Sequence, residues 1–79
     1  MKLNFSNDAI KTIGKLDSNT AGRIFKGVID LPDKGDIKPL EGKHTGQFRL
    51  RIGDWRVIYT IENGIVEVGY ILPRGDAYK

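Results

Sequence analysis

At 79 residues and a net charge of +3, the chain is long enough for one small domain but leaves little room for a deep pocket beside its core. Its 39% hydrophobic and 29% charged residues exclude a disordered protein. With no cysteine and one histidine, disulfides and thiolate metal sites are excluded and a structural zinc site is disfavoured.

No apolar run is long enough to span a bilayer, and residues 1–5 lack the apolar core of a signal peptide. We therefore expect a cytoplasmic protein that forms a single domain over residues 1–79. It should need no membrane and no metal or other cofactor. The net charge is compatible with a nucleic-acid partner, and four of the five arginines lie in the second half of the chain.

A short strand and two helices are predicted in the first half. Residues 2–5 alternate between apolar and polar, and Ser6 offers an N-cap directly after them. Asp17 or Ser18 offers a second N-cap, and Pro32 ends the second helix. Because the two helices are joined so tightly, we expect an antiparallel helical hairpin. Both segments carry apolar residues at helical spacing: Ala9, Ile10, Ile13 and Leu16, then Ala21, Ile24, Val28 and Leu31.

Residues 32–46 are rich in Pro, Gly, Asp and Lys, which predicts a long loop with Ile37 and Leu40 against the core. The single histidine, His44, lies in this loop and is interpreted as a solvated residue rather than a catalytic base. By the same reasoning three glutamates are interpreted as surface charges: Glu41, Glu62 and Glu67.

Residues 47–59 are typical of a β-hairpin whose two-residue loop is Gly53-Asp54. The register then sets Arg51 opposite Arg56, with Arg49 on the same face and the apolar residues on the other. Like charges facing each other across two strands are destabilising by about 0.2–1 kcal/mol. Two interpretations remain open: a site for an anion, favoured by the choice of arginine, or an edge that resists aggregation.

A second hairpin is predicted at Asn63-Gly64, the strongest short-range hairpin signal. Extending its register places Gly69 as an opening beside the arginines, on a face that also carries Glu67 and Ile71. The expected fold is α+β in the order β-α-α-β-β-β, an antiparallel sheet packed on the helical hairpin. The pairs expected on the core face are Ile61 with Val66, Tyr59 with Val68, Val57 with Tyr70, and Trp55 with Leu72.

The residues exclude a Ser-His-Asp or Cys-His arrangement and offer no carboxylate cluster for a metal. The arginines of the predicted hairpin, together with Arg74 and Tyr78 in the tail, could bind a phosphodiester and neutralise a pentacoordinate phosphorus. RNA supplies its own nucleophile in the 2′-hydroxyl. Tyr78 could transfer a proton or stack on a base, or it could simply anchor the C-terminus.

Several strings of this sequence closely resemble the RelE/ParE superfamily of type II toxin–antitoxin toxins. They are residues 39–42 (PLEG), 48–59 (FRLRIGDWRVIY) and 71–74 (ILPR), with Tyr78 four residues further on. The junctions at residues 5–6 and 15–17 are similar as well, so the resemblance covers essentially the whole chain.

The resemblance implies the same fold and, for the RelE branch, a metal-independent endoribonuclease that cuts mRNA in the ribosomal A site by 2′-hydroxyl attack. The RNA-binding positions of that branch fall on Arg49 and Arg51. Its catalytic positions fall on Arg56, Arg74 and Tyr78. The ParE branch shares the fold, inhibits DNA gyrase and does not need the basic set, so a gyrase inhibitor without nuclease activity is the alternative.

Partners follow from the same resemblance. We expect a cognate antitoxin that wraps a disordered segment around the basic surface or displaces the C-terminal tail, and an exposed apolar patch between sheet and helices would suit it. The ribosome with mRNA in its A site is the second expected partner, with DNA gyrase as the alternative. A basic adaptor that binds RNA or an acidic peptide without cutting is a further interpretation.

Overall fold

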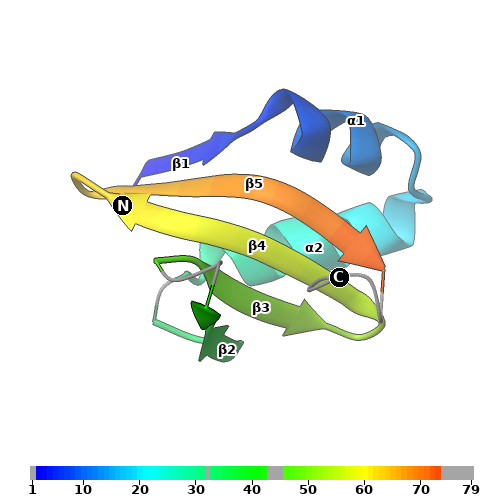
Figure 1. Cartoon of the computed structure of the whole chain (residues 1–79). Helices are drawn as coiled ribbons and strands as arrows, with labels where there is room; N and C mark the ends of the chain where they lie inside the picture. The colour runs from blue at the N-terminus through cyan, green and yellow to red at the C-terminus, as the bar shows by residue number, and fades with distance from the viewer. Residues whose placement is uncertain (1, 32, 43–45, 74–79) are drawn as a thin grey trace.

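The computed structural model describes residues 2–31, 33–42 and 46–73. Five strands form one mixed sheet in the order β1-β5-β4-β3-β2, with both helices packed on one of its faces (Figure 1). The predicted α+β class is confirmed. The elements along the chain are β1 (Lys2–Phe5), α1 (Asn7–Gly14), α2 (Ser18–Ile29), β2 (Asp36–Pro39), β3 (Phe48–Ile52), β4 (Trp55–Glu62) and β5 (Ile65–Pro73).

Both helices begin at the predicted caps. The Ser6 hydroxyl accepts a hydrogen bond from the amide of Ala9 at 3.1 Å, and the Asp17 carboxylate accepts one from the amide of Thr20 at 3.2 Å. The Thr20 hydroxyl donates to Asp17 as well, and this bond is the main reason that the pKa of Asp17 is lowered. The chain reverses direction between α1 and α2, as the helical hairpin requires (Figure 1). Neither of these helices is long and apolar enough to cross a membrane.

The edges of the sheet differ from the prediction. β1 pairs with β5 in parallel, from Lys2 beside Ile65 to Phe5 beside Val68, so the sheet is mixed rather than antiparallel. The predicted loop over residues 32–46 is wrong at 36–39, because β2 pairs there with β3. Its apolar-polar alternation is too short to stand out among the surrounding Pro, Gly and Lys residues.

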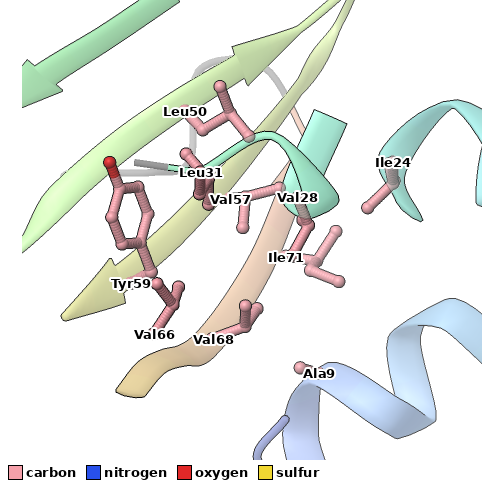
Figure 2. Close-up of a cluster of buried hydrophobic side chains, with 10 residues drawn as sticks. All are labelled: Ala9, Ile24, Val28, Leu31, Leu50, Val57, Tyr59, Val66, Val68 and Ile71. Atoms are coloured by element: carbon pink, nitrogen blue, oxygen red, sulfur yellow. The ribbon is translucent and has the colours of Figure 1, made fainter. Parts of the chain in front are cut away.

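The core lies between the helices and the inner face of the sheet (Figure 2). An added Cβ at Gly27 of α2 would lie 2.6 Å from Ile52 Cδ1, so a larger residue where this helix meets β3 would require the Ile52 side chain to move. Tyr59 is 2% exposed and stacks on Phe48, and burial raises the pKa of its phenol. The buried cluster consists of Ala9, Ile24, Val28, Leu31, Leu50, Val57, Tyr59, Val66, Val68 and Ile71.

The register of the first hairpin is confirmed at every predicted pair, including Arg51 opposite Arg56. The second is confirmed from the Asn63-Gly64 turn as far as Tyr59 opposite Val68. Beyond that point a β-bulge shifts the pairing by one residue, so the remaining predicted pairs are wrong. The observed pairs are Ile58 with Tyr70, Val57 with Ile71, Arg56 with Leu72, and Trp55 with Pro73.

The bulge changes which residues of β5 face the core. Gly69 is the extra residue, since Val68 and Tyr70 on either side of it pair with consecutive residues of β4. Ile71 therefore faces the core and is 2% exposed, whereas the predicted register had placed it on the opposite face. Tyr70 moves the other way and is 49% exposed on the face away from the helices.

Candidate functional site

Three arginines lie on the face of the sheet that the helices leave open. Arg49 and Arg51 alternate with buried Leu50 on β3, and Arg56 precedes buried Val57 on β4. Because side chains alternate between the two faces of a sheet, all three point away from the core. Arg49, Arg51 and Arg56 are called the arginine surface below, and the prediction that they share one face is confirmed.

Arg49 is a largely enclosed member of the arginine surface. Its side chain is only 13% exposed, and its Nη2 donates to Asp36 Oδ1 at 3.2 Å. Its Nε is buried and has no hydrogen-bond partner among the described residues. A buried N–H without a partner costs about 1–3 kcal/mol, a cost that would be relieved if the Arg49 side chain moved to bring its Nε to a bound anion.

Sequence reasoning missed Asp36 because it assigned the residue to a loop. In the structure Asp36 stands on β2 opposite Arg51, so it lies on the same face as the arginines. The available signal was the single apolar Ile37 between polar Asp36 and Lys38, which is the alternation of a short edge strand. Asp36 orients Arg49 and reduces the net positive charge at that end of the surface.

Arg51 and Arg56 face each other across the hairpin. Arg51 is exposed, whereas Arg56 is partly buried and its Nη1 donates to the carbonyl of Trp55 at 3.4 Å. This contact uses one donor of the Arg56 guanidinium and leaves the others for a ligand. A phosphate placed between the two side chains would convert their repulsion into attraction.

A pocket of about 150 Å³ lies on the same face, beyond the arginines, and is called the Gly69 pocket. Buried Ile58 and the bulge residue Gly69 line it, so an opening does lie at Gly69, but none of the described arginines lines it as the prediction had expected. Exposed Tyr70 stands at its side. Its polar lining residues are Asn4, Ser6, Gln47, Thr60 and Glu67.

Ser6 fixes the bulge to the start of α1. Its hydroxyl donates to the carbonyl of Gly69 while accepting from the amide of Ala9, and its own amide donates to the carbonyl of Val68 at 2.9 Å. One serine therefore caps a helix and anchors the strand that forms the Gly69 pocket.

Replacing Ser6 with alanine should lower the free energy of unfolding by about 1–2 kcal/mol, because a cap and a hydrogen bond to Gly69 are lost together. Urea unfolding followed by circular dichroism measures this change. Ser18→Ala is the matched control, since Ser18 is exposed in the first turn of α2 and Asp17 supplies that cap. Equal losses in the two variants would contradict the role assigned to Ser6.

The remaining predicted site residues, Arg74 and Tyr78, lie outside the described residues, as does His44. Residues 2–31, 33–42 and 46–73 contain no group of three or more His, Asp or Glu side chains that could hold a metal ion.

Comparisons with known proteins agree on the fold. The RelBE2 toxin–antitoxin complex of Mycobacterium tuberculosis contains a chain with 21% identity and a TM-score of 0.78, covering 92% of this chain and 96% of that one. A chain of the archaeal RelE–RelB complex of Pyrococcus horikoshii OT3 has 26% identity and a TM-score of 0.75, covering 96% and 97%. YafQ of E. coli has 17% identity and a TM-score of 0.70, covering 99% and 98%.

Comparison with curated proteins finds no match. The family model described as the ParE toxin of the type II toxin–antitoxin system, parDE, matches residues 3–78. The chain therefore belongs to the ParE toxin family, within the RelE/ParE superfamily of type II toxin–antitoxin toxins.

Proposed function

We propose that this toxin is an endoribonuclease that cuts mRNA in the ribosomal A site and thereby inhibits translation. The observation that carries the proposal is the arginine surface, in which Arg51 faces Arg56 and a buried Nε of Arg49 has no partner among the described residues. Such a surface is costly without an anion and suits a phosphodiester. The ParE branch of the superfamily does not need these residues for its action on gyrase.

In the proposed reaction the 2′-oxygen of the RNA bonds to the adjacent phosphorus and the bond to the 5′-oxygen breaks. The 2′-hydroxyl loses a proton, and the departing 5′-oxygen gains one. Arg49 and Arg51 would hold the backbone around the cut, while Arg56 and Arg74 would stabilise the charge that builds up on the phosphorane. Tyr78 would stack on a base and assist proton transfer. Arginine is not deprotonated at neutral pH, so it acts here only as a cation and hydrogen-bond donor.

The experiment that tests this function maps mRNA 5′ ends in translating cells that express the toxin or its Arg56→Ala/Arg74→Ala double variant. Cuts that keep the phase of the codons should appear with the wild type and disappear with the double variant. Growth arrest without such cuts, or equal cutting by both proteins, would refute the nuclease. Accumulation of gyrase–DNA cleavage complexes would instead support the alternative, a gyrase inhibitor.

We also propose that the cognate antitoxin covers an apolar stripe where β1 meets α2. Phe5 of β1 and Phe25 of α2 meet edge to face with ring centroids 5.7 Å apart. Phe25 is 41% exposed, Leu3 on the same strand face as Phe5 is 36% exposed, and Ile29 one turn beyond Phe25 is 68% exposed. Toxin–antitoxin complexes among the similar structures support a protein partner for such a surface.

Replacing Ile29 with aspartate should weaken antitoxin binding by about tenfold or more, because a charge would be buried in an apolar contact. Titration calorimetry with the antitoxin encoded by the neighbouring gene measures the affinity. Asn19→Asp adds a negative charge at the far end of the same helix and should bind normally. Equal affinity of the two variants would place the antitoxin elsewhere.

A further inference from the structure

The Gly69 pocket combines features that suit a flat, hydrogen-bonding ligand. Ile58 is 4% exposed, and Gly69 has no side chain, so the middle of the pocket is apolar and open. Tyr70 is 49% exposed at its side and offers an aromatic surface for stacking. We propose that this pocket binds one base of the RNA and selects guanine, an inference that rests on the proposed function and names its substrate preference.

The position of the pocket fits a nucleotide whose phosphate lies on the arginine surface. Ile58, in the pocket, is the direct cross-strand neighbour of Arg49. Arg56 lies two residues from Ile58 on the same strand and the same face, a separation of about 7 Å along β4. A base in the pocket and its phosphate at Arg49 and Arg56 would therefore be neighbouring parts of one nucleotide.

Glu67 supplies the selectivity. Its carboxylate accepts hydrogen bonds and cannot donate them when ionised. It stands between Asn4 of β1 and Thr60 of β4 and forms no ion pair with any residue that the structure describes. Glu67 is exposed and lines the pocket, so its oxygens are available to a ligand that enters there.

Guanine is the base that matches this carboxylate. Its N1–H and N2–H₂ groups are adjacent donors, and both can bond to the two oxygens of one carboxylate. Adenine and cytosine each place a ring acceptor next to their amino group, and uracil flanks its one N–H with two carbonyls, so each would set a lone pair against Glu67. Asn4 and Gln47 also line the pocket, and an amide side chain can donate to the O6 carbonyl of guanine.

The test titrates the isotope-labelled toxin with GMP, AMP, CMP and UMP and follows the backbone amides of Gly69 and Tyr70 by NMR. Since the four ligands carry the same phosphate, differences among them report the base. GMP should saturate these shifts at a concentration at least about tenfold lower than the other three. Glu67→Gln should abolish that preference, and Glu62→Gln, the same change at an exposed residue outside the pocket, should retain it.

A second variant closes the pocket without straining the backbone. A Cβ at Gly69 would meet only the carbonyl oxygen of Ile58, at 3.7 Å, so Gly69→Val should fold while its larger side chain occupies the space. In this variant none of the four nucleotides should shift the amides at positions 69 and 70, and circular dichroism verifies that it is folded.

The outcomes separate this inference from the proposed function. If the wild type cuts mRNA but GMP causes no selective shift, or if Glu67→Gln keeps the preference, the pocket does not select guanine and the nuclease stands. If GMP binds selectively through Glu67 but mRNA is not cut, the pocket binds a guanine nucleotide and the nuclease is wrong. If the toxin cuts, Glu67→Gln should also relax the base preference of the mapped cut sites.

Discussion

Replacing Arg56 with alanine should lower the rate of mRNA cleavage on programmed ribosomes by about 100- to 1000-fold, the usual cost of removing one preorganised donor to a transition-state oxyanion. The guanidinium is partly buried and donates to the Trp55 carbonyl, which restricts its motion before charge develops on the phosphorus. Single-turnover cleavage with toxin in excess over ribosomes measures the chemical step. Arg56→Lys should recover part of the rate, because lysine restores the positive charge but not the planar guanidinium that makes two parallel hydrogen bonds.

The free energy of unfolding of Arg56→Ala distinguishes a loss of catalysis from damage to the fold. Arg56→Ala removes a like-charge contact with Arg51, so the free energy of unfolding should stay constant or rise by about 0.2–1 kcal/mol. Lys11→Ala removes a positive charge from an exposed position of α1, on the other side of the sheet from the arginine surface, and should cleave normally. Full cleavage by a folded Arg56→Ala protein would refute the role assigned to this residue.

Replacing Leu50 with alanine should lower the free energy of unfolding by about 2–5 kcal/mol. Leu50 is 1% exposed and packs in the cluster formed by the helices and the central strands. A domain of this size has a total stability of about 4–12 kcal/mol, so the variant would lose a large share of it. Because Leu50 lies between Arg49 and Arg51 on β3, the arginine surface should lose its alignment as well.

Urea unfolding of the free toxin provides the measurement, and Ile29→Ala provides the control. Ile29 is 68% exposed, so the same kind of truncation should change the free energy of unfolding by less than about 0.5 kcal/mol. A small effect at Leu50 would mean that the core of the toxin relaxes around the missing side chain.

Local turn chemistry explains why most of the sheet could be predicted from the sequence. Gly53-Asp54 and Asn63-Gly64 each determine a two-residue loop, and alternation then assigns the arginines to one face. The wrongly predicted pairs lie between β4 and β5, far from the Asn63-Gly64 turn, where the bulge at Gly69 shifts the register. A glycine within a strand is a weak signal of a bulge, because it also fits an ordinary strand position.

The errors at the sheet edges have a different cause. β1 and β2 are four-residue strands whose pairing depends on distant parts of the chain rather than on a turn. Asp36 could therefore not be placed beside Arg49 from the sequence, although their ion pair shapes the arginine surface. The roles of Arg49, Arg51, Arg56, Arg74 and Tyr78 come from resemblance, and they stay predictions.

The bond between the Ser6 hydroxyl and the Gly69 carbonyl joins residues 63 positions apart, and β1 pairs in parallel with the last strand of the sheet. A chain growing from its N-terminus cannot form either contact until β5 has left the ribosome that makes it. The Gly69 pocket and the full sheet are consequently completed only after β5 has been synthesised. A nascent chain should thus be inactive in the proposed cleavage until β5 has been made, and the folding step that completes the sheet is a point at which the proposed antitoxin could intercept it.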